Sequence, residues 1–420
     1  MKNIKETICN DIKCRICGGR ISIEQVAEIP YDLLTTEKGG TKYRQRIYEC
    51  PVCGYVGVAN SFDEDVLRDM YENTAKYEGS PESRITTDDY SGFRERSEAM
   101  VCSNLQKQLL SSILTEVESV CDIGASTGYL LSLLDCEERL GIEPSPLNKS
   151  IARHVYGVDI YTGNLQDYDA QFPEKKFDLM TASHVLEHID NVVEFVRIIR
   201  RHAAKYVLVE VPTIEKRFKN RPYDLFLYEH ISYFSLDVIK RLFEGEENGF
   251  HLVDALINFC PQTQVAVDLP SIITLWKSDA YDNTVETRHT MKMAGLRKNK
   301  EGFLKGYLSE SRDELDAIKR RVESWVQDSK CAVFCAGAHT ERLFGCGFFE
   351  NINIGRIYDN SEKKLDKYIA GIPVVGFSMD DMRSHGIGHI IVSTNNFQND
   401  IVYYLEKAGV TDDAIVCLYE

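Results

Sequence analysis

Two patterns of apolar and polar positions alternate through the middle of the chain. Short apolar runs such as "VESVCDIG" and "FDLMTAS" are each followed by a longer stretch with apolar residues at helical spacing. From about Leu105 this order predicts a doubly wound parallel α/β sheet. The same design returns at "KCAVFCAGAHTERLF", so we predict a second, incomplete Rossmann-like sheet near the C-terminus.

Between the two predicted sheets, residues 295–329 read as one long amphipathic helix with a solvated charged face. Its apolar positions are Phe303, Leu304, Tyr307, Leu308, Leu315, Ile318, Val322, Trp325 and Val326. The pattern divides the chain into a small module (1–65), a linker or lid (66–104), a first α/β domain (105–270), a helical connector (271–329) and a second α/β domain (330–420).

Composition narrows the class of protein. The chain has 420 residues, 43% of them hydrophobic, and a formal net charge of −16. Such acidity argues against nucleic acid or an anionic membrane as a partner. No window approaches 18 uninterrupted apolar residues, and the N-terminal segment lacks the apolar stretch of a secretion signal. The 13 scattered cysteines suit reduced thiols in a cytoplasmic protein better than a disulfide framework.

Two cysteine pairs near the N-terminus differ from the rest. "CRIC" contains Cys14 and Cys17, "CPVC" contains Cys50 and Cys53, and a glycine follows each pair. Two residues between cysteines let both thiolates reach one ion, and the glycine relieves the backbone beside the sulfurs. Two such turns predict a structural Cys₄ zinc site. The alternatives are a redox pair or unrelated thiols.

The first predicted strand of the α/β domain runs into a glycine-containing loop, "DIGASTGYLL". Asp122, Gly124, Ser126 and Gly128 stand at alternate positions, and a helix is expected near Tyr129. Such a loop brings backbone amides close to a ligand at the carboxyl edge of the sheet. The next strand, "RLGIEP", ends in Glu143, where an acidic residue binds ribose hydroxyls.

The third and fourth segments complete a nucleoside pocket. In "VDIYTGNLQDY" we expect Asn164 and Leu165 to lie beside an adenine edge, and we place Ser183 with the cofactor at the end of "FDLMTAS". The turn that follows, "HVLEHIDN", contains His188. A generic NAD-binding fold is the alternative, but a dinucleotide needs phosphate room that "VLEHI" does not suit.

This succession of motifs, over roughly residues 100–215, resembles the class I S-adenosylmethionine-dependent methyltransferases. With the cysteine pairs before it and an α/β domain after it, the whole chain resembles the sugar C-methyltransferases of nucleotide-deoxysugar biosynthesis. In that family a proton leaves the carbon beside a keto group, and the resulting enolate is methylated. The substrate is a sugar attached to a nucleoside diphosphate.

The resemblance also assigns roles. The segment "YDLFLYEHISYFS" matches the family's Glu-His motif, which makes His230 the base and Glu229 the residue that orients it. His188 is then the hydrogen-bond donor to the enolate oxygen, although the two histidine roles are interchangeable. The family's tyrosine falls on Leu227, and Tyr228 is one place away, so we place Tyr228 with the substrate. Tyr90, in the linker, is a fourth catalytic candidate.

In the C-terminal domain the resemblance implies binding of the nucleotide-sugar. The turn "CAGAHT" offers Gly337 and His339 to a diphosphate, and His339 would add a positive charge. Two alternatives stay open. One is an O- or N-methyltransferase acting on a sugar or other small metabolite; the other is an NAD-binding oxidoreductase or nucleotide-binding regulator. The expected partner is a small molecule, and the oligomeric state is left open.

Overall fold

The computed structural model describes residues 12–60, 90, 93–95, 97–217, 221–227, 230–244, 249–258, 270–281, 302–394 and 398–419. The chain forms two compact units, and both are discontinuous in sequence. Unit 1 comprises residues 1–23, 49–216 and 229–300, and unit 2 comprises residues 24–48, 217–228 and 301–420. Within the described ranges, no helix is long and apolar enough to cross a membrane.

Unit 1 is built on a seven-stranded sheet with the order β12-β13-β10-β9-β6-β7-β8. Its strands are β6 (Ser119–Ile123), β7 (Glu138–Glu143), β8 (Asp159–Thr162), β9 (Phe177–Ser183), β10 (Ala203–Pro212), β12 (Phe250–Asn258) and β13 (Ser271–Ser278). The pairs from β8 to β10 are parallel, whereas β13 runs antiparallel to both of its neighbours. The predicted parallel sheet is confirmed. It extends beyond residue 270, because β13 is one of its inner strands and is not part of a connector.

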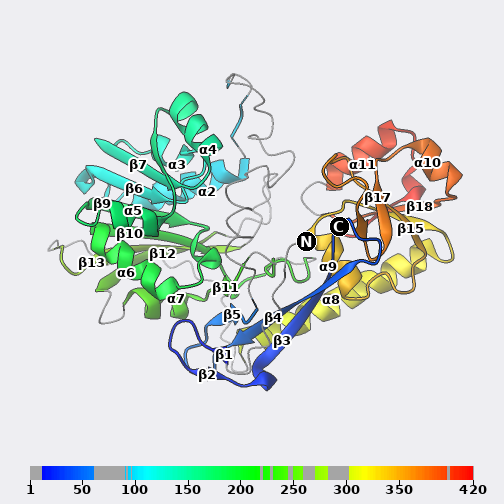
Figure 1. Ribbon diagram of the computed structural model, residues 1–420, viewed down its shortest axis with the longest axis horizontal. Helices are drawn as coiled ribbons and strands as arrows, with labels where there is room; N and C mark the ends of the chain where they lie inside the picture. Colours follow the sequence, from blue (N-terminus) through cyan, green and yellow to red (C-terminus); the bar gives the residue numbers. More distant parts are fainter. Residues whose placement is uncertain are drawn as a thin grey trace. The chain divides into compact units, whose positions relative to one another are not determined.

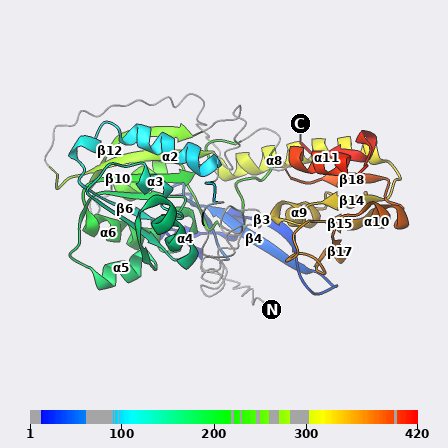
Figure 2. The same ribbon diagram turned by 90° about the horizontal axis from the view of Figure 1, so that it is seen from above.

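Helices cover both faces of this sheet (Figures 1 and 2). One face carries α2 (Ser97–Leu110), α3 (Tyr129–Ser132) and α4 (Pro146–Ile151), and the other carries α5 (Leu165–Gln171), α6 (Val192–His202) and α7 (Leu236–Phe243). Short helical turns are η3 (Leu114–Glu116), η4 (Ala152–Tyr156) and η5 (Leu186–His188). Polar N-caps begin several helices, because their side chains accept an amide proton of the first turn. These caps are Ser145, Asn164, Asn191 and Ser235.

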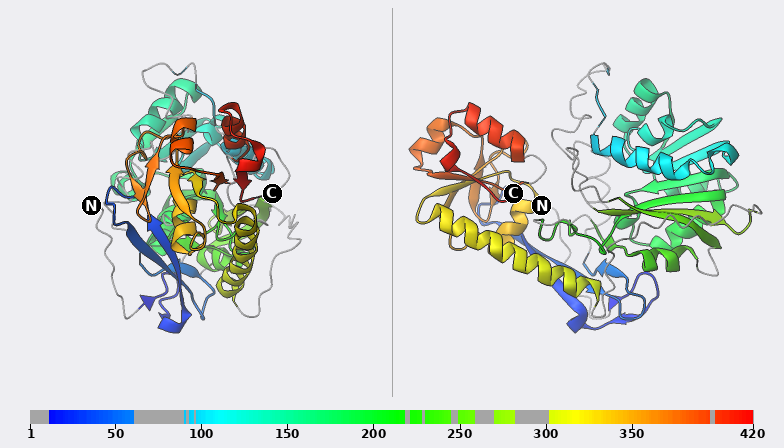
Figure 3. Two further views of the ribbon diagram at one scale, coloured as in Figure 1. Left: turned by 90° about the vertical axis from the view of Figure 1, so that its right-hand side faces the viewer. Right: turned by 180° about the vertical axis from the view of Figure 1, so that it is seen from behind.

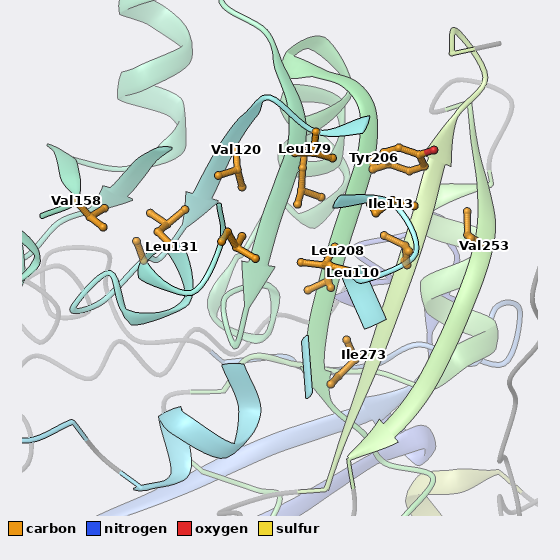
Figure 4. Close-up of a cluster of buried hydrophobic side chains, with 14 of the residues drawn as sticks. Leu110, Ile113, Val120, Leu131, Val158, Leu179, Tyr206, Leu208, Val253 and Ile273 are labelled. Atoms are coloured by element: carbon orange, nitrogen blue, oxygen red, sulfur yellow. The ribbon is translucent and has the colours of Figure 1, made fainter. Parts of the chain in front are cut away.

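One hydrophobic core of unit 1 lies between the sheet and α2 to α4. Successive strands each contribute residues that point to one face, since side chains alternate along a strand. Figure 4 shows Val120, Leu179, Leu208 and Ile273 meeting Leu131 and residues from the α2 region, all of them nearly inaccessible to solvent. The remaining strands of unit 1 are β1 (Ile12–Lys13) and β2 (Arg20–Ile21), which pair with each other, and β5 (Val56–Val58), which pairs antiparallel with β11 (Ser232–Tyr233).

Unit 2 contains the predicted second α/β sheet, with the order β16-β17-β15-β14-β18-β19. The strands are β14 (Cys331–Phe334), β15 (Ile354–Tyr358), β16 (Tyr368–Ile369), β17 (Ile372–Val375), β18 (His389–Val392) and β19 (Ile415–Cys417). The accompanying helices are α9 (Ala338–Gly345), α10 (Met379–Ser384), α11 (Gln398–Lys407) and the turn η6 (Asp412–Ala414). Met382 and Leu405 pack with Phe334 and Ile390 in its core.

The predicted long helix is confirmed as α8 (Phe303–Val326), drawn in yellow in Figure 3 with α10 and α11 at the opposite side of unit 2. Its buried positions include Leu304, Tyr307, Leu315 and Val322, as the helical spacing indicated. Trp325 is the exception among the expected core residues, because it is 51% exposed.

A β-hairpin from the N-terminal part of the chain belongs to unit 2. It consists of β3 (Val26–Leu33) and β4 (Thr41–Glu49), preceded by the turn η1 (Ile23–Gln25). The helix α9 packs on β3 so closely that a Cβ at Gly345 would lie 2.4 Å from the Pro30 carbonyl oxygen and 2.6 Å from the Tyr31 Cα. Only glycine allows this approach, because backbone atoms cannot move aside as a side chain can.

We expect Gly345→Ala to destabilise unit 2 by about 2 kcal/mol or more, since the added methyl group forces α9 away from β3. Urea unfolding, combined with hydrogen exchange of peptides from α9 and β3, measures the effect. The matched control is Gly376→Ala, where no atom lies within 4 Å of the position that the added methyl group would occupy and the backbone is unstrained. Equal stability of the two variants would contradict the close packing.

Candidate functional site

The order of the strands identifies a ligand-binding edge in unit 1. From β6 the chain proceeds through β7 to β8 on one side, and then returns to place β9 on the other side of β6. Crevices of parallel α/β sheets open at the carboxyl ends of the strands where the order reverses in this way. The loop after β6 and the turn after β9 therefore flank the expected binding site.

The loop after β6 has the conformation expected from its glycines. Gly124 and Gly128 have φ values of 69° and 79°, and Ser126, between them, has a φ of 48°. A Cβ at Gly124 would lie 2.6 Å from the Val185 side chain. The loop thus needs glycine at Gly124 for close approach as well as for its backbone angle. Ser126 shows that a side chain is accommodated at the middle position.

Glu143, at the end of β7, is fixed by the backbone around it. One carboxylate oxygen accepts the Ser126 amide at 3.0 Å, and the other accepts the Ser145 amide at 3.0 Å. The side chain is only 7% exposed. These contacts orient the carboxylate at the carboxyl edge, where an acidic residue can hold a ribose diol.

Asp122 is buried at the end of β6 and accepts the Thr181 hydroxyl at 2.6 Å. Burial raises its pKa to about 7, and the charge of Glu143 adds to the rise, although the Thr181 hydrogen bond opposes it. At neutral pH this carboxyl group therefore exchanges readily between its two protonation states.

The three other residues expected at the cofactor have clear local contacts. Asn164 caps α5 by accepting the Asp167 amide at 2.8 Å, and Leu165 is 1% exposed. Ser183 donates its hydroxyl to Glu210 at 3.1 Å and accepts the Gln106 amide group at 2.8 Å. Their role at a cofactor stays a prediction.

Two of the predicted catalytic residues lie together beside the turn after β9. The rings of His188 and His230 are 4.9 Å apart, edge to face. Glu187 lies with them, since its Oε1 is 3.9 Å from His188 Nε2, and ligand-type atoms of all three residues are within 4.8 Å of one another. Glu187 is 1% exposed and His230 is 5% exposed. A buried imidazole beside a partly exposed one and a carboxylate is a suitable proton acceptor.

Backbone contacts hold this group in place. The Ile231 amide donates to the Glu187 carbonyl at 2.8 Å, which ties the segment after His230 to η5. The pairing of β5 with β11, and the Tyr233 hydroxyl on the His230 carbonyl at 3.0 Å, fix the same segment from the other side. Two segments well separated in the sequence are thereby brought into contact.

Of the three other residues predicted at the acceptor, Tyr90, Glu229 and Tyr228, the structure describes only Tyr90. Tyr90 stacks on His154, with ring centroids 4.8 Å apart, and its catalytic role stays a prediction. Glu229 and Tyr228 lie outside the described residues. Among the described residues, Glu187 is the carboxylate beside the histidine pair. It lies in the "VLEHI" motif, from which only His188 was predicted.

Sequence reasoning also missed a buried polar cluster behind η5. Glu210 in β10 is fully buried and interacts with Gln106, Ser183, Asn258 and Ser271. His184 links it to Glu187, with its Nδ1 3.2 Å from Glu187 Oε1 and its Nε2 3.7 Å from Glu210 Oε1. One signal was available in the sequence: a glutamate inside the apolar run "YVLVEVP".

The four N-terminal cysteines converge as predicted. The Cys14 and Cys53 sulfurs are 3.5 Å apart, and the Cys17 and Cys50 sulfurs are 3.6 Å apart. A tetrahedral ion with bonds of about 2.3 Å to sulfur requires separations near 3.8 Å, so the four thiols fit a zinc-sized ion. The glycines after each pair, Gly18 and Gly54, have φ values of 69° and 74°. Both turns therefore have the conformation that the sequence predicted.

The loop after β14 in unit 2 corrects one expectation. Gly337 is the N-cap of α9, and both ring nitrogens of His339 are engaged, one with Arg342 and one with Tyr419. Burial, aided by the charge of Arg342, holds the pKa of His339 well below its usual range. The expected positive charge on His339 is therefore wrong, because the ring is neutral at pH 7. The role of both residues in substrate binding stays a prediction.

Comparison with known proteins finds one matching family model and several similar solved structures. Residues 93–255 match the family model described as a methyltransferase domain. A structure of magnesium protoporphyrin IX methyltransferase from Synechocystis PCC 6803 with bound SAH is 15% identical, covers 51% of this chain and 100% of its own, and gives a TM-score of 0.38. A SAM-dependent methyltransferase from Archaeoglobus fulgidus is 16% identical, covers 43% and 95%, and gives a TM-score of 0.34. No curated protein matches the chain.

The family match and the strand order together define a class I methyltransferase domain over residues 93–255. For this domain the predicted fold class and the predicted enzyme class, a methyltransferase, are confirmed. The acceptor of the methyl group is a finer question.

Binding of S-adenosylmethionine at pH 7 should release up to about half a proton from Asp122, because a cationic ligand favours the carboxylate form of a group whose pKa is about 7. Calorimetry in two buffers of different ionisation enthalpy measures this release. In Asp122→Asn the buffer dependence should be smaller than in the unmodified protein. An unchanged dependence would show that Asp122 does not sense the ligand.

Proposed function

We propose that the protein transfers a methyl group from S-adenosylmethionine to the carbon beside a keto group of a nucleoside-diphosphate sugar. The observation that carries this proposal is the contact between His188 and His230, beside Glu187 and next to the switch point. A carbon atom accepts a methyl group only after losing a proton, so a base must lie at the acceptor.

The cofactor's proposed contacts are with the first part of the sheet. The loop from Gly124 to Gly128 faces it with backbone amides, Glu143 holds its ribose hydroxyls, and Asn164 and Leu165 lie at its adenine. Bound there, the cofactor supplies an electrophilic methyl group on a sulfonium. Asp122 compensates part of the positive charge of the ligand.

The histidines perform the acid–base step. An imidazole nitrogen of His230 takes the proton from the carbon, and the electron pair of the broken C–H bond forms the enolate. His188 donates a hydrogen bond to the enolate oxygen and so stabilises the developing charge. Burial of His230 strengthens its interactions, because little water competes with them.

Unit 2, taken by itself, has features of a second nucleotide-binding loop. In unit 1 the loop after the first strand donates an amide to the acid at the end of the second strand, from Ser126 to Glu143. Unit 2 repeats this contact, since the Ala336 amide donates to Asp359 at 2.7 Å. The repetition supports a second nucleotide-binding loop, near Gly337.

An O-methyltransferase is the second candidate. It is favoured by Leu227, which replaces the tyrosine of the sugar C-methyltransferases that the chain resembles. In that case His230 would deprotonate a hydroxyl group instead of a carbon. The base and the cofactor site would be the same.

Solvent exchange separates the two acceptors. With a nucleoside-diphosphate keto-sugar in D₂O and no methyl donor, a C-methyltransferase exchanges the proton beside the ketone, and mass spectrometry detects it. We expect His230→Ala to lower this exchange by about 100-fold or more, as loss of a general base does, while S-adenosylhomocysteine still binds.

The matched control is His251→Ala, since His251 is in the same unit and its side chain is 75% exposed. This variant should catalyse proton exchange at the same rate as the unmodified protein. If proton exchange is normal in His230→Ala and lost in His188→Ala, then His188 is the base and His230 is the hydrogen-bond donor. No exchange in the unmodified protein, with methylation of a hydroxyl group, would favour the second candidate.

We also propose that the four thiols hold one structural Zn²⁺, because a closed tetrahedral sulfur site leaves no position for a substrate. Elemental analysis should find about one zinc per chain, and Cys53→Ala should lose it and unfold at a lower temperature. Cys136→Ala removes a cysteine elsewhere in unit 1 and should keep the metal. A metal-free protein of unchanged stability would rule out this role.

A further inference from the structure

Glu210 is a buried carboxylate that is linked to the histidine pair through His184 and Glu187. Glu210 has no solvent exposure, and its oxygens interact with side chains from α2, β9, β12 and β13. Burial opposes its charge, but the His184 ring 3.7 Å away, with help from Ser271 and Gln106, lowers the pKa of Glu210 to about 2. Glu210 is therefore a permanent anion at working pH.

His184 connects this anion to η5. It follows β9 with a left-handed φ of 54°, and its own amide donates to the Glu210 carbonyl at 2.9 Å. Its ring lies between two carboxylates, 3.2 Å from Glu187 and 3.7 Å from Glu210. Burial favours the neutral ring, but Cys102 and the two carboxylates beside it raise the pKa of His184 well above its usual range.

Glu187 continues the row of charged side chains that begins with Glu210 and His184. Its Oε1 lies 3.2 Å from His184 Nδ1 and 3.9 Å from His188 Nε2. Among the described residues, its other oxygen has no hydrogen-bond partner although it is buried. Burial raises the pKa of Glu187, but the His184 hydrogen bond and the charges of His188, His184 and His230 outweigh it and lower that pKa.

The charges of the row, counted over the described residues only, bear on the histidine pair. Two carboxylates and the His184 imidazolium give one net negative charge, next to the pair of His188 and His230. Nearby, Cys102 contributes a thiol, and Arg15 and Asp190 neutralise each other at 2.8 Å. The Glu187 carboxylate, 3.9 Å from His188 Nε2, therefore places a negative charge where it favours an imidazolium in the pair.

We propose that His184 and Glu187 are positioning residues that set the basicity of the catalytic pair, through the row Glu210–His184–Glu187–His188/His230. Glu187 orients the pair and stabilises the imidazolium formed when the pair takes the acceptor's proton. Glu187 and His184 keep their own charge states during that step. The link to catalysis rests on the proposed function, whereas the coupling of charges within the row does not.

The first test replaces Glu187 by glutamine, which keeps its shape and removes its charge. The ring carbons of His188 and His230, followed by NMR as pH is varied, should show protonation of the pair at a pH lower by about one unit or more, because an opposite charge at this range shifts titration by that amount. The acid limb of the exchange-rate profile should move by the same amount. Glu194→Gln, a half-exposed carboxylate on α6, is the control and should move neither.

The second test examines the coupling between His184 and Glu187. His184→Asn is chosen because asparagine tolerates the left-handed backbone at this position. The carboxyl carbon of Glu187 should then titrate at a clearly higher pH than in the unmodified protein. This measurement does not depend on the first variant being folded, and calorimetry with S-adenosylhomocysteine checks the folding of both.

An unchanged titration of the pair in Glu187→Gln, or of Glu187 in His184→Asn, would overturn the coupling. Failure of the methylation assay with normal coupling would instead refute the proposed acceptor and leave the row intact. A fall in rate in Glu187→Gln with an unmoved acid limb would reduce Glu187 to a packing role.

Discussion

A charge that has no access to water, that of Glu210, organises the carboxyl edge of the first sheet. A buried carboxylate is tolerated only when its hydrogen bonds are made, and removing a partner costs about 3–5 kcal/mol. The groups that surround it come from α2, from the end of β9 and from two antiparallel strands. Meeting this one requirement therefore fixes how those elements end, and with them the turn that presents His188.

Much of the fold was predictable, because it is encoded locally. The apolar runs that became β6 to β9, the glycines of the first loop and the two cysteine turns each show their structure within a few residues. The same is true of α8, whose helical spacing marks the buried side. Trp325 departs from the pattern because amphipathic spacing does not fix how far round the helix the core extends.

What the sequence could not show depends on contacts between distant segments. The strand β13 enters the sheet between β10 and β12, an insertion that no periodicity reveals, and this moved the true edge of the domain beyond residue 270. The charge state of His339 depends on Arg342 and Tyr419 around it. The row through His184 and Glu187 likewise arises only when strands far apart in the chain end side by side.

The packing of α9 against β3 has a consequence for synthesis on the ribosome. The Leu34 amide and the Glu341 carboxylate, which bond in the finished protein, are 307 residues apart. At about 5–20 residues per second, the early hairpin waits roughly 15 to 60 seconds for the helix that covers it. During that interval its apolar surface is a target for chaperones or for association with another nascent chain.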